Sequence, residues 1–497
     1  MITSNLLRFT LALVIIIAGA SGSIADDKPP QQLQAKGLLR LLPEDSVTEH
    51  SIDTPQGKLA YTATAGTLRF YDQSGEQNAS VFYTAYVIKG TKRPLTFVFN
   101  GGPGAASAFL HLGLIGPRLL DLGQDARDFA HAQLRDNPDT WLRFTDLVMI
   151  DPIGTGWSRS ANEGKTYWNA DSDASAMAKA IALYVIHNNR FDSPKYLFGE
   201  SYGGFRAAKT ARVMQREQGI SASGIVMLSP LIEGWLTFGD DESALRAALE
   251  LPSLAAAELE RKKAFTAQAL SAAEKFAFTD YLTTLVSHPP EGDAARAFYE
   301  KVAQVSGLPL DLVTQQRGFV TDAFIKNLQK DKMVSRYDAS FAVDDPFPER
   351  RSAHAPDPIL DGVSRAYGGA FAAYAHNELG FKTEMTYQLL ADDVIHNWDW
   401  KGGRQSAGIE SDLRVLLSFD PSFRLLIAHG YSDLVTPYAM TRYLLDHMPA
   451  FAPPGRAVLK LYRGGHMIYL DPASRKAFSS DAAVFFHASE SQGAAPR

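Results

Sequence analysis

A serine at position 201 has the surroundings of a nucleophile. The segment Gly-Glu-Ser-Tyr-Gly at 199–203 follows an apolar run that predicts a buried strand, and a helical pattern begins directly after it. A Gly-x-Ser-x-Gly turn between a strand and a helix lifts the serine hydroxyl above the sheet, where it can attack a carbonyl carbon. By itself the pattern is equally compatible with a surface turn, so the interpretation depends on partners elsewhere in the chain.

Two later residues can supply the base and the acid that activate a weakly nucleophilic serine. Asp433 follows an apolar run at 424–428 that predicts a strand, and His466 follows a second predicted strand at 458–462. Alone, Asp433 could be a turn residue and His466 a packed core residue. The order Ser, Asp, His, each after a strand, is the order of the α/β-hydrolase fold. We therefore predict a catalytic triad in which His466 is the base and Asp433 orients it.

A glycine-rich turn, Asn-Gly-Gly-Pro-Gly at 100–104, follows a further predicted strand at 97–99. In α/β-hydrolases a turn at this place donates one amide to the oxyanion of the tetrahedral intermediate, and the residue after the nucleophile donates the other. We therefore predict an oxyanion hole formed by the backbone N–H groups of Gly102 and Tyr202. The alternative is a tight loop without a catalytic role.

The elements that must position these residues predict an α/β protein, an α/β-hydrolase fold with a mixed, mostly parallel central sheet. Alternating patterns at 58–87 indicate antiparallel strands, and several short apolar runs indicate buried strands. From 239 to about 330, Ala, Glu, Leu and Lys recur with helical spacing, which predicts a largely helical cap insertion. On the return path, Trp398 and Trp400 could line a substrate pocket or pack the cap against the core.

The N-terminal residues predict export. Arg8 precedes an apolar run that is too short for a comfortable membrane span, and small residues at 23–25 precede a plausible cleavage site. We expect a periplasmic or secreted protein with no stable membrane span after cleavage, the alternative being an uncleaved N-terminal anchor. The predicted segments are a signal peptide (1–25), a flexible N-terminal segment (26–45), the first part of the core (46–238), the cap insertion and return segment (239–408), the second part of the core (409–488) and a disordered tail (489–497).

The composition argues against several other functions. The chain has no Cys, which excludes disulfides, thiolate metal sites and a cysteine nucleophile. Its net charge of −6, without a basic block, argues against a nucleic-acid partner. There is no Gly-x-x-x-x-Gly-Lys phosphate loop or His-Glu-x-x-His zinc helix, and the 12 histidines lack ligand spacing. We expect no cofactor and no metal.

Four sequence blocks together match the pattern of one known family. They are Asn-Gly-Gly-Pro-Gly at 100–104, Asp-Pro-Ile-Gly-Thr-Gly-Trp-Ser at 151–158, Gly-Glu-Ser-Tyr-Gly at 199–203 and Gly-His-Met at 465–467. In these blocks the chain resembles the serine carboxypeptidases, peptidase family S10. The resemblance covers about 95–235 and 410–475 and is weak in between. The chain has no cysteine and has Ala105 where the family commonly has Cys. In this respect it resembles the bacterial branch of the family most.

The resemblance implies a serine-type carboxypeptidase that hydrolyses the C-terminal bond of a peptide through an acyl-enzyme intermediate. It also implies that the free carboxylate of the peptide is held by Asn100, a backbone amide at Gly101 and Glu200. A protonated Glu and the amide of Asn can both donate to a carboxylate. In the family, that Glu shares a proton with a second carboxylate located fourteen residues after the Asn.

The chain departs from the family pattern at this second carboxylate, because Leu114 stands fourteen residues after Asn100. Two hypotheses follow. Either burial alone keeps Glu200 protonated and the site still recognises a terminal carboxylate, or the site has lost that preference and hydrolyses esters or amides more loosely. His111 lies three residues earlier, and we expect it to be an ordinary packed histidine.

Two further functions stay open beside the carboxypeptidase. An esterase or acyltransferase would use the same triad, because this fold hosts many acyl-transfer chemistries. A non-catalytic binding module would use the pocket without the chemistry, and the complete Ser-Asp-His set speaks against it.

Overall fold

The computed structural model describes residues 37–493 except 91, 124–128, 130, 163, 351–355 and 452. The predicted signal peptide and residues 26–36 of the predicted flexible segment lie outside the described residues, as do residues 494–497 of the predicted tail. No helix within the described part of the chain combines the length and the apolar character needed to cross a membrane.

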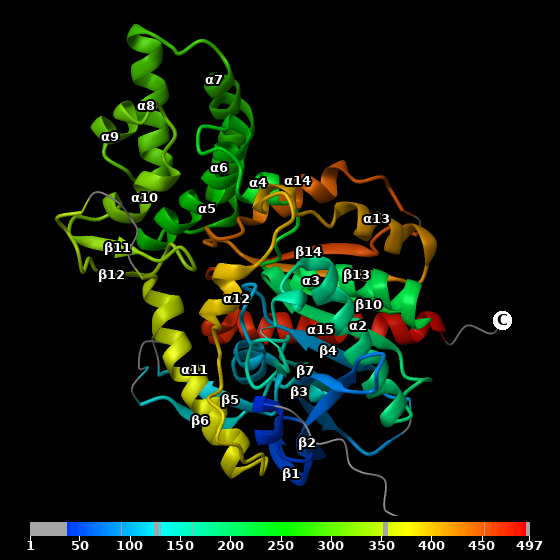
Figure 1. Ribbon diagram of the computed structural model, residues 1–497. Coiled ribbons are helices and arrows are strands. Elements are labelled where there is room, and N and C mark those ends of the chain that lie inside the picture. The colour runs from blue at the N-terminus through cyan, green and yellow to red at the C-terminus, as the bar shows by residue number, and fades with distance from the viewer. Residues whose placement is uncertain are drawn as a thin grey trace, which may run out of the picture. The chain divides into compact units, whose positions relative to one another are not determined.

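A ten-stranded mixed sheet forms the centre of the fold (Figure 1). Strands β1, β2 and β3 pair antiparallel, β3 pairs antiparallel with β7, and all further pairs along the sheet are parallel. This arrangement confirms the predicted mixed, mostly parallel sheet. In spatial order the strands are β1 (Ser46–Thr54), β2 (Gly57–Tyr71), β3 (Gln77–Val87), β7 (Asp146–Ile150), β4 (Leu95–Phe99), β9 (Lys195–Glu200), β10 (Gly224–Leu228), β13 (Arg424–Gly430) and β14 (Ala457–Tyr462), with β8 (Arg159–Ser160) paired to β3.

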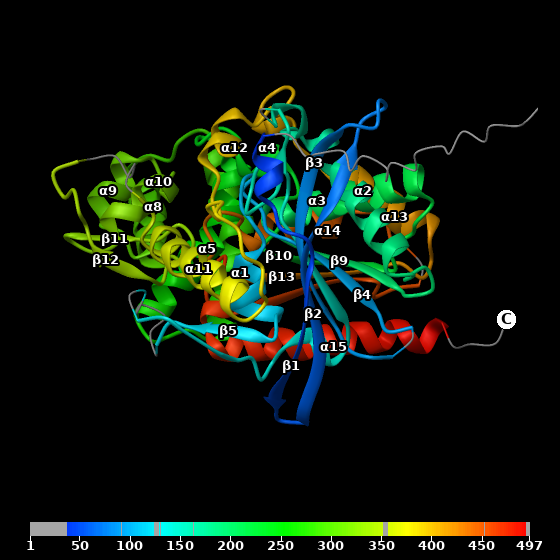
Figure 2. The same cartoon turned by 60° about the horizontal axis from the view of Figure 1, so that its bottom comes forward.

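Helices cover both faces of the sheet, which explains why its central strands are apolar along their whole length. In β10, Ile225 and Met227 belong to the hydrophobic cluster of one face, and Val226 and Leu228 belong to the cluster of the other. Figure 2 shows α15 along the face opposite to α2 and α3. The first face carries α2 (Ala170–His187), α3 (Tyr202–Val213), α13 (Glu410–Phe419) and α14 (Tyr438–His447), and the second carries α1 (Ala108–Leu110), α11 (Pro358–Asn377) and α15 (Pro472–Gly493).

The residues after 239 form a helical group with a hydrophobic cluster of its own. Its helices lie together at the upper left of Figure 1. They are followed by α11, whose side chains pack in the cluster of the sheet instead, including Val363 and Phe371. The group consists of α5 (Ala244–Arg261), α6 (Ala267–Phe276), α7 (Leu282–Val286), α8 (Gly292–Ser306), α9 (Leu310–Gln315), α10 (Thr321–Asn327) and the hairpin of β11 (Lys332–Val334) and β12 (Ala342–Asp344), with a π-helical turn η6 (Ala277–Tyr281).

Short elements complete the fold. The hairpin of β5 (Arg118–Asp121) and β6 (Gln133–Asp136) forms a separate two-stranded sheet. The others are the helices α4 (Gly234–Thr237) and α12 (Asp392–Asn397), the 3-10 turns η1 (Gly37–Leu41), η3 (Trp141–Arg143), η4 (Lys165–Tyr167), η7 (Arg404–Ser406) and η8 (Ile468–Leu470), and the π-helical turns η2 (His111–Ile115) and η5 (Met214–Gln218).

The topology brings the predicted functional loops to one edge of the sheet. Strands β4, β9, β13 and β14 run parallel to one another within the sheet, so their carboxyl ends lie on the same side. The loops after these four strands carry Asn100, Ser201, Asp433 and His466 respectively. Ligands of open α/β sheets bind outside the carboxyl ends of the strands, which is where these residues are.

Candidate active site

Ser201 lies in a sharp turn between β9 and α3. Its backbone has φ 60° and ψ −127°, a region that non-glycine residues adopt at a cost of about 1–3 kcal/mol. A Cβ on Gly199 would lie 1.9 Å from the carbonyl oxygen of Gly203, and a Cβ on Gly203 would lie 2.6 Å from the carbonyl oxygen of Phe99. The two glycines therefore allow close backbone contacts, whereas the positive φ of the turn is at Ser201 itself.

The imidazole of His466 contacts the carboxylate of Asp433. His466 Nδ1 lies 2.9 Å from Asp433 Oδ2, and both side chains are buried. The other carboxylate oxygen of Asp433 accepts hydrogen bonds from the backbone N–H groups of Val435 and Thr436, at 2.7 and 3.0 Å. With Nδ1 held by Asp433, Nε2 is the ring nitrogen left for a proton exchange with a nucleophile or substrate.

The two partners shift each other's pKa. Burial raises the pKa of Asp433, but the charge of His466 and the hydrogen bond from its ring outweigh burial, so the pKa of Asp433 is lowered. Burial lowers the pKa of His466, but the charge of Asp433 and its hydrogen bond raise the pKa of His466 above its usual value. An ionised Asp433 therefore stabilises the imidazolium form of His466.

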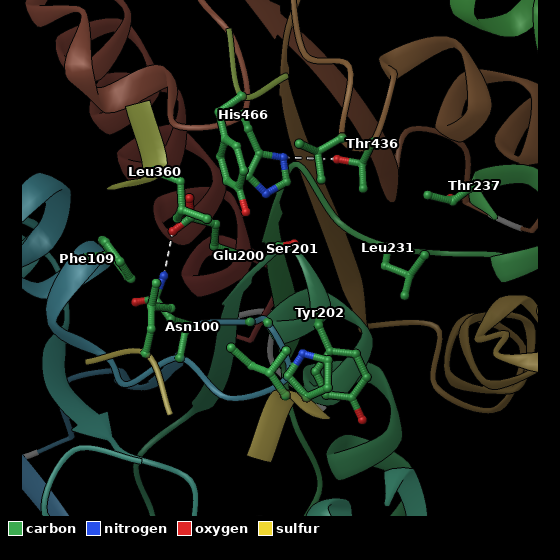
Figure 3. Close-up of a pocket in the computed structure, with 18 of the residues that line it drawn as sticks. Asn100, Phe109, Glu200, Ser201, Tyr202, Leu231, Thr237, Leu360, Thr436 and His466 are labelled. Atoms are coloured by element: carbon green, nitrogen blue, oxygen red, sulfur yellow. Dashed lines mark hydrogen bonds between the residues drawn. The ribbon is translucent and has the colours of Figure 1, made fainter. Parts of the chain in front are cut away.

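Thr436 is a further member of this group that the sequence analysis did not identify. Its Oγ1 lies 2.9 Å from both Asp433 Oδ2 and the carbonyl oxygen of Ser229, and 3.2 Å from His466 Nδ1, the contact drawn as a dashed line in Figure 3. The spacing Asp-x-x-Thr after a strand was a usable signal, because an Asp side chain often accepts from backbone and hydroxyl groups two to three residues later. Thr436 fixes the orientation of the Asp433 carboxylate.

Ser201 and His466 line one pocket, which has an empty volume of about 910 Å³ including its mouth. The predicted oxyanion donors Gly102 and Tyr202 line the same pocket. A Cβ on Gly101 would lie 2.7 Å from Tyr202 N, so the glycine turn approaches the nucleophile closely. Gly102 has φ 101°, a conformation that favours glycine, and Tyr202 is the first residue of α3, where the N–H has no acceptor within the helix.

Asn100 and Glu200, predicted from the family resemblance to hold a carboxylate, contact each other in this pocket. Asn100 Nδ2 donates to Glu200 Oε2 at 2.6 Å, the dashed line between them in Figure 3, while Asn100 Oδ1 accepts from the N–H of Leu110. Gly101 lies beside them in the pocket lining. The hydrogen bond of Leu110 fixes the Asn100 amide so that its nitrogen points to Glu200.

Tyr469 is the second residue missed in the sequence, and it lies next to Glu200. Its hydroxyl is 3.2 Å from Glu200 Oε1 and 3.1 Å from Glu200 Oε2. Leu114, which occupies the place of the expected partner acid, is fully buried in the core. A Cβ on Gly113, the residue before Leu114, would lie 2.6 Å from the ring of Tyr469. A tyrosine hydroxyl from η8 thus contacts the carboxyl group for which the sequence offered no partner.

The electrostatics of Glu200 differ from those of Asp433. Burial raises the pKa of Glu200 to about 7. The charge of His466 and the hydrogen bonds from Tyr469 and Asn100 act in the opposite direction, and burial outweighs them. Near neutral pH, Glu200 is therefore present in both its protonated and its ionised form.

Three aromatic residues considered in the sequence have distinct positions. His111 is buried outside the pocket lining, its Nε2 lies 2.7 Å from the hydroxyl of Tyr86, and burial lowers its pKa to about 3, so it is a packed histidine. Trp398 is buried and packs against the ring of Tyr202 at 5.3 Å between centroids. Trp400 lines the pocket. Of the two roles considered for these tryptophans, Trp398 therefore has core packing and Trp400 has pocket lining.

A comparison with protein families matches residues 56–452 of the chain to the serine carboxypeptidases, peptidase family S10. The matched range contains Ser201 and Asp433 and ends before His466. It covers most of the chain, and it confirms the family predicted from the four sequence blocks.

Individual relatives match shorter stretches. The chain is 31% identical over 169 residues to serine carboxypeptidase-like 44 of Arabidopsis thaliana, covering 32% of this chain and 32% of that protein. It is 34% identical over 118 residues to the retinoid-inducible serine carboxypeptidase of Mus musculus, covering 23% of this chain and 24% of that protein. These alignments therefore span a third or less of the length of the curated relatives.

Among solved structures, the fold is similar to Kex1(delta)p, a prohormone-processing carboxypeptidase from Saccharomyces cerevisiae. The TM-score is 0.52 at 14% sequence identity, covering 86% of this chain and 91% of the other. At this identity the similarity concerns the fold, and it agrees with the predicted α/β-hydrolase class.

Proposed function

The chain belongs to the serine carboxypeptidase family, and we propose that it hydrolyses the C-terminal peptide bond of peptides with a free C-terminus. In the first step Ser201 Oγ attacks the scissile carbonyl carbon while His466 Nε2 takes the hydroxyl proton. Asp433 keeps the imidazole in the tautomer that leaves Nε2 free to accept. The N–H groups of Gly102 and Tyr202 donate to the oxyanion of the tetrahedral intermediate.

The same residues complete the reaction. His466 Nε2 gives its proton to the nitrogen of the terminal residue, the C–N bond breaks, and the rest of the peptide stays as an ester on Ser201. A water molecule then attacks this ester while His466 accepts its proton, and Ser201 leaves with that proton as the shortened peptide is released. No metal or cofactor takes part in this scheme.

Recognition of the terminal carboxylate is the part of the proposal that separates a carboxypeptidase from a general esterase. We assign it to Asn100, the N–H of Gly101 and the protonated carboxyl group of Glu200. The observation that carries this assignment is the buried Asn100–Glu200 pair in the same pocket as Ser201, with the pKa of Glu200 raised to about 7 by burial. Of the two hypotheses left by Leu114, the contacts of Glu200 therefore favour carboxylate recognition.

The test compares N-blocked dipeptides that carry either a free C-terminal carboxylate or a C-terminal amide. We expect release of single terminal residues from the free acids, at a kcat/KM at least tenfold above that of the matched amides, and no release by Ser201→Ala. Turnover of ester substrates without release of amino acids would instead support the esterase or acyltransferase. Failure of a fluorophosphonate probe to label Ser201 would support a binding module without catalysis.

Export to the periplasm or the medium is a further part of the proposal. It is supported by the sequence of residues 1–25, with Arg8 before an apolar run and small residues before Asp26. Expression of the full chain followed by mass spectrometry of the mature N-terminus tests it, and a mature protein that retains residues 1–25 would contradict it.

A further inference from the structure

The two walls of the pocket beside Ser201 carry different groups. Figure 3 shows Asn100 and Glu200 on one side of Ser201 and Thr237 and Leu231 on the other. The acidic and basic side chains in the lining are Glu200, His466 and Arg404. Glu200 and His466 belong to the machinery described above, whereas Arg404 has no role in it.

Aromatic contacts assign Arg404 to the wall of Tyr202. The ring of Trp400 packs edge-on against the ring of Tyr202, with centroids 5.7 Å apart at 89°. The guanidinium carbon of Arg404 lies 5.9 Å from the Trp400 ring centre and 5.7 Å from the ring centre of Phe238. Arg404 therefore lies beside Trp400 and Phe238. Phe238 directly follows Thr237, which Figure 3 shows on the side of Ser201 away from the Asn100–Glu200 pair.

The backbone around Arg404 is fixed to the segment that follows β10. The side-chain amide of Gln405 donates to the carbonyl oxygen of Phe238 at 2.9 Å, and the N–H of Gly234 donates to the carbonyl oxygen of Ala407 at 2.6 Å. A Cβ on Gly234 would lie 1.9 Å from the carbonyl oxygen of Arg404, so the two segments touch backbone to backbone. These contacts hold η7 beside the pocket and set the position from which the Arg404 side chain extends.

Arg404 also lacks an acidic partner within the described part of the chain, where its charged group contacts aromatic rings instead. Its neighbour Lys401 lies 3.5 Å from Asp171, and the buried Arg206 lies 2.7 Å from Asp173. The Arg404 side chain is exposed, so water rather than a carboxylate now solvates its charge. A guanidinium over aromatic rings keeps its planar set of N–H donors free for a carboxylate ligand.

We propose that Arg404 selects peptides whose penultimate residue is Asp or Glu. This inference rests on the proposed function. If the terminal carboxylate binds at Asn100 and Glu200, the preceding residue, whose carbonyl carbon bonds to Ser201, directs its side chain to the opposite wall. The side-chain carboxylate of Asp or Glu would there meet the Arg404 guanidinium, and a Lys or Arg side chain would be repelled.

The expected effect is moderate, because the ion pair forms at an exposed position. Exposed pairs contribute up to about 1 kcal/mol, so we expect kcat/KM for a penultimate Glu to be about fivefold that for the uncharged Gln of similar shape. The preference should shrink in high salt, which screens exposed charges. It requires an ionised substrate side chain, so the comparison is made above about pH 5.

The experiment measures kcat/KM for N-blocked dipeptides that share one terminal residue and carry Glu, Gln or Lys before it. In the unmodified protein we expect the order Glu, Gln, Lys. Arg404→Gln should bring the Glu-to-Gln ratio to about one with the rate for Gln unchanged, and Arg404→Glu should favour Lys. Lys401→Gln is the matched control, because it removes an exposed cation three residues away and should leave the ratio as it was.

Two results would overturn the inference while leaving the proposed function in place. One is an equal Glu-to-Gln ratio in the unmodified protein and in Arg404→Gln. The other is an equal loss on all peptides in Arg404→Gln, which would mean that Arg404 supports the pocket or the peptide backbone. Absence of any terminal-residue release in the unmodified protein contradicts the proposed function, and the inference with it.

Discussion

Two buried carboxyl groups of the candidate active site, Asp433 and Glu200, have opposite pKa shifts. Asp433 accepts hydrogen bonds from two backbone N–H groups and lies against the ring of His466, and its pKa is lowered. Among the residues that the structure describes, Glu200 has only the side chains of Asn100 and Tyr469 as donors, and burial raises its pKa to about 7. The number and charge of the neighbouring donors, rather than burial itself, decide which carboxyl group stays ionised.

The difference fits the different tasks that we propose for the two groups. Because its pKa is lowered, Asp433 stays ionised to lower pH than an ordinary Asp and can stabilise the imidazolium of His466. A Glu200 that keeps its proton up to about neutral pH can donate to a substrate carboxylate, which an ionised Glu would repel. Each of the following experiments changes one side of this comparison.

The largest effect should come from Asp433→Asn. The amide removes the negative charge that holds His466 in its reactive tautomer, and we expect kcat to fall by about 10³–10⁴. Steady-state kinetics on a blocked dipeptide measures the loss. Asp420→Asn, which changes a carboxylate that accepts from Ser422 in a distant turn, is the control and should keep its activity. A loss below tenfold for Asp433→Asn would show that Asp433 does not orient the base.

The second effect concerns stability, because the folded-state pKa of Glu200, about 7, lies above the usual value of 4.5. The stability that this group contributes is fully present below pH 4.5 and is lost as pH rises through about 7. Glu200→Gln should therefore match the unmodified protein at pH 4.5 and exceed it at pH 8 by up to about 3 kcal/mol. Denaturant unfolding at both pH values measures this difference. A constant difference between the two proteins at all pH values would contradict the raised pKa.

The third effect is a pH profile. His466 must be neutral to accept a proton, so kcat/KM should rise as pH increases through its raised pKa. For free-acid substrates kcat/KM should fall again, up to about tenfold, above pH 7 as Glu200 ionises. Esters without a free carboxylate should lack this second limb, and so should Glu200→Gln with free acids. An identical decrease of kcat/KM above pH 7 for esters and free acids would show that ionisation of Glu200 does not cause the decrease.

The smallest effect should come from Tyr469→Phe. The hydroxyl of Tyr469 lowers the pKa of Glu200, so its removal should move the alkaline limb for free-acid substrates to higher pH. One lost hydrogen bond contributes about 1 kcal/mol, which corresponds to a shift of less than one pH unit. Tyr462→Phe, which removes a similar hydrogen bond to Asp481, is the control and should leave the limb unchanged. A shift of the alkaline limb to lower pH in Tyr469→Phe would mean that the Tyr469 hydroxyl raises the pKa of Glu200 instead of lowering it.

Much of the fold could be predicted from short stretches of sequence. The strand-turn-helix pattern around Ser201, the apolar runs before Asp433 and His466 and the helical spacing after 239 are local signals, since a period of two or 3.6 residues needs only neighbours in the chain. The family followed from four such blocks and is confirmed by the match over 56–452. The roles of Ser201, Asp433 and His466 stay predictions, although their positions agree with them.

The sequence by itself determined the order of the elements, the chemistry of the turn around Ser201 and the absence of an acid at Leu114. The tertiary structure alone decided what stands beside Glu200, because Tyr469 reaches it across 269 residues of chain. It also decided that Trp400 lines the pocket while Trp398 packs in the core, and that Arg404 lines the same pocket as Glu200. Such contacts join loops from distant strands, and their geometry is set by the packing of the whole sheet rather than by any local pattern.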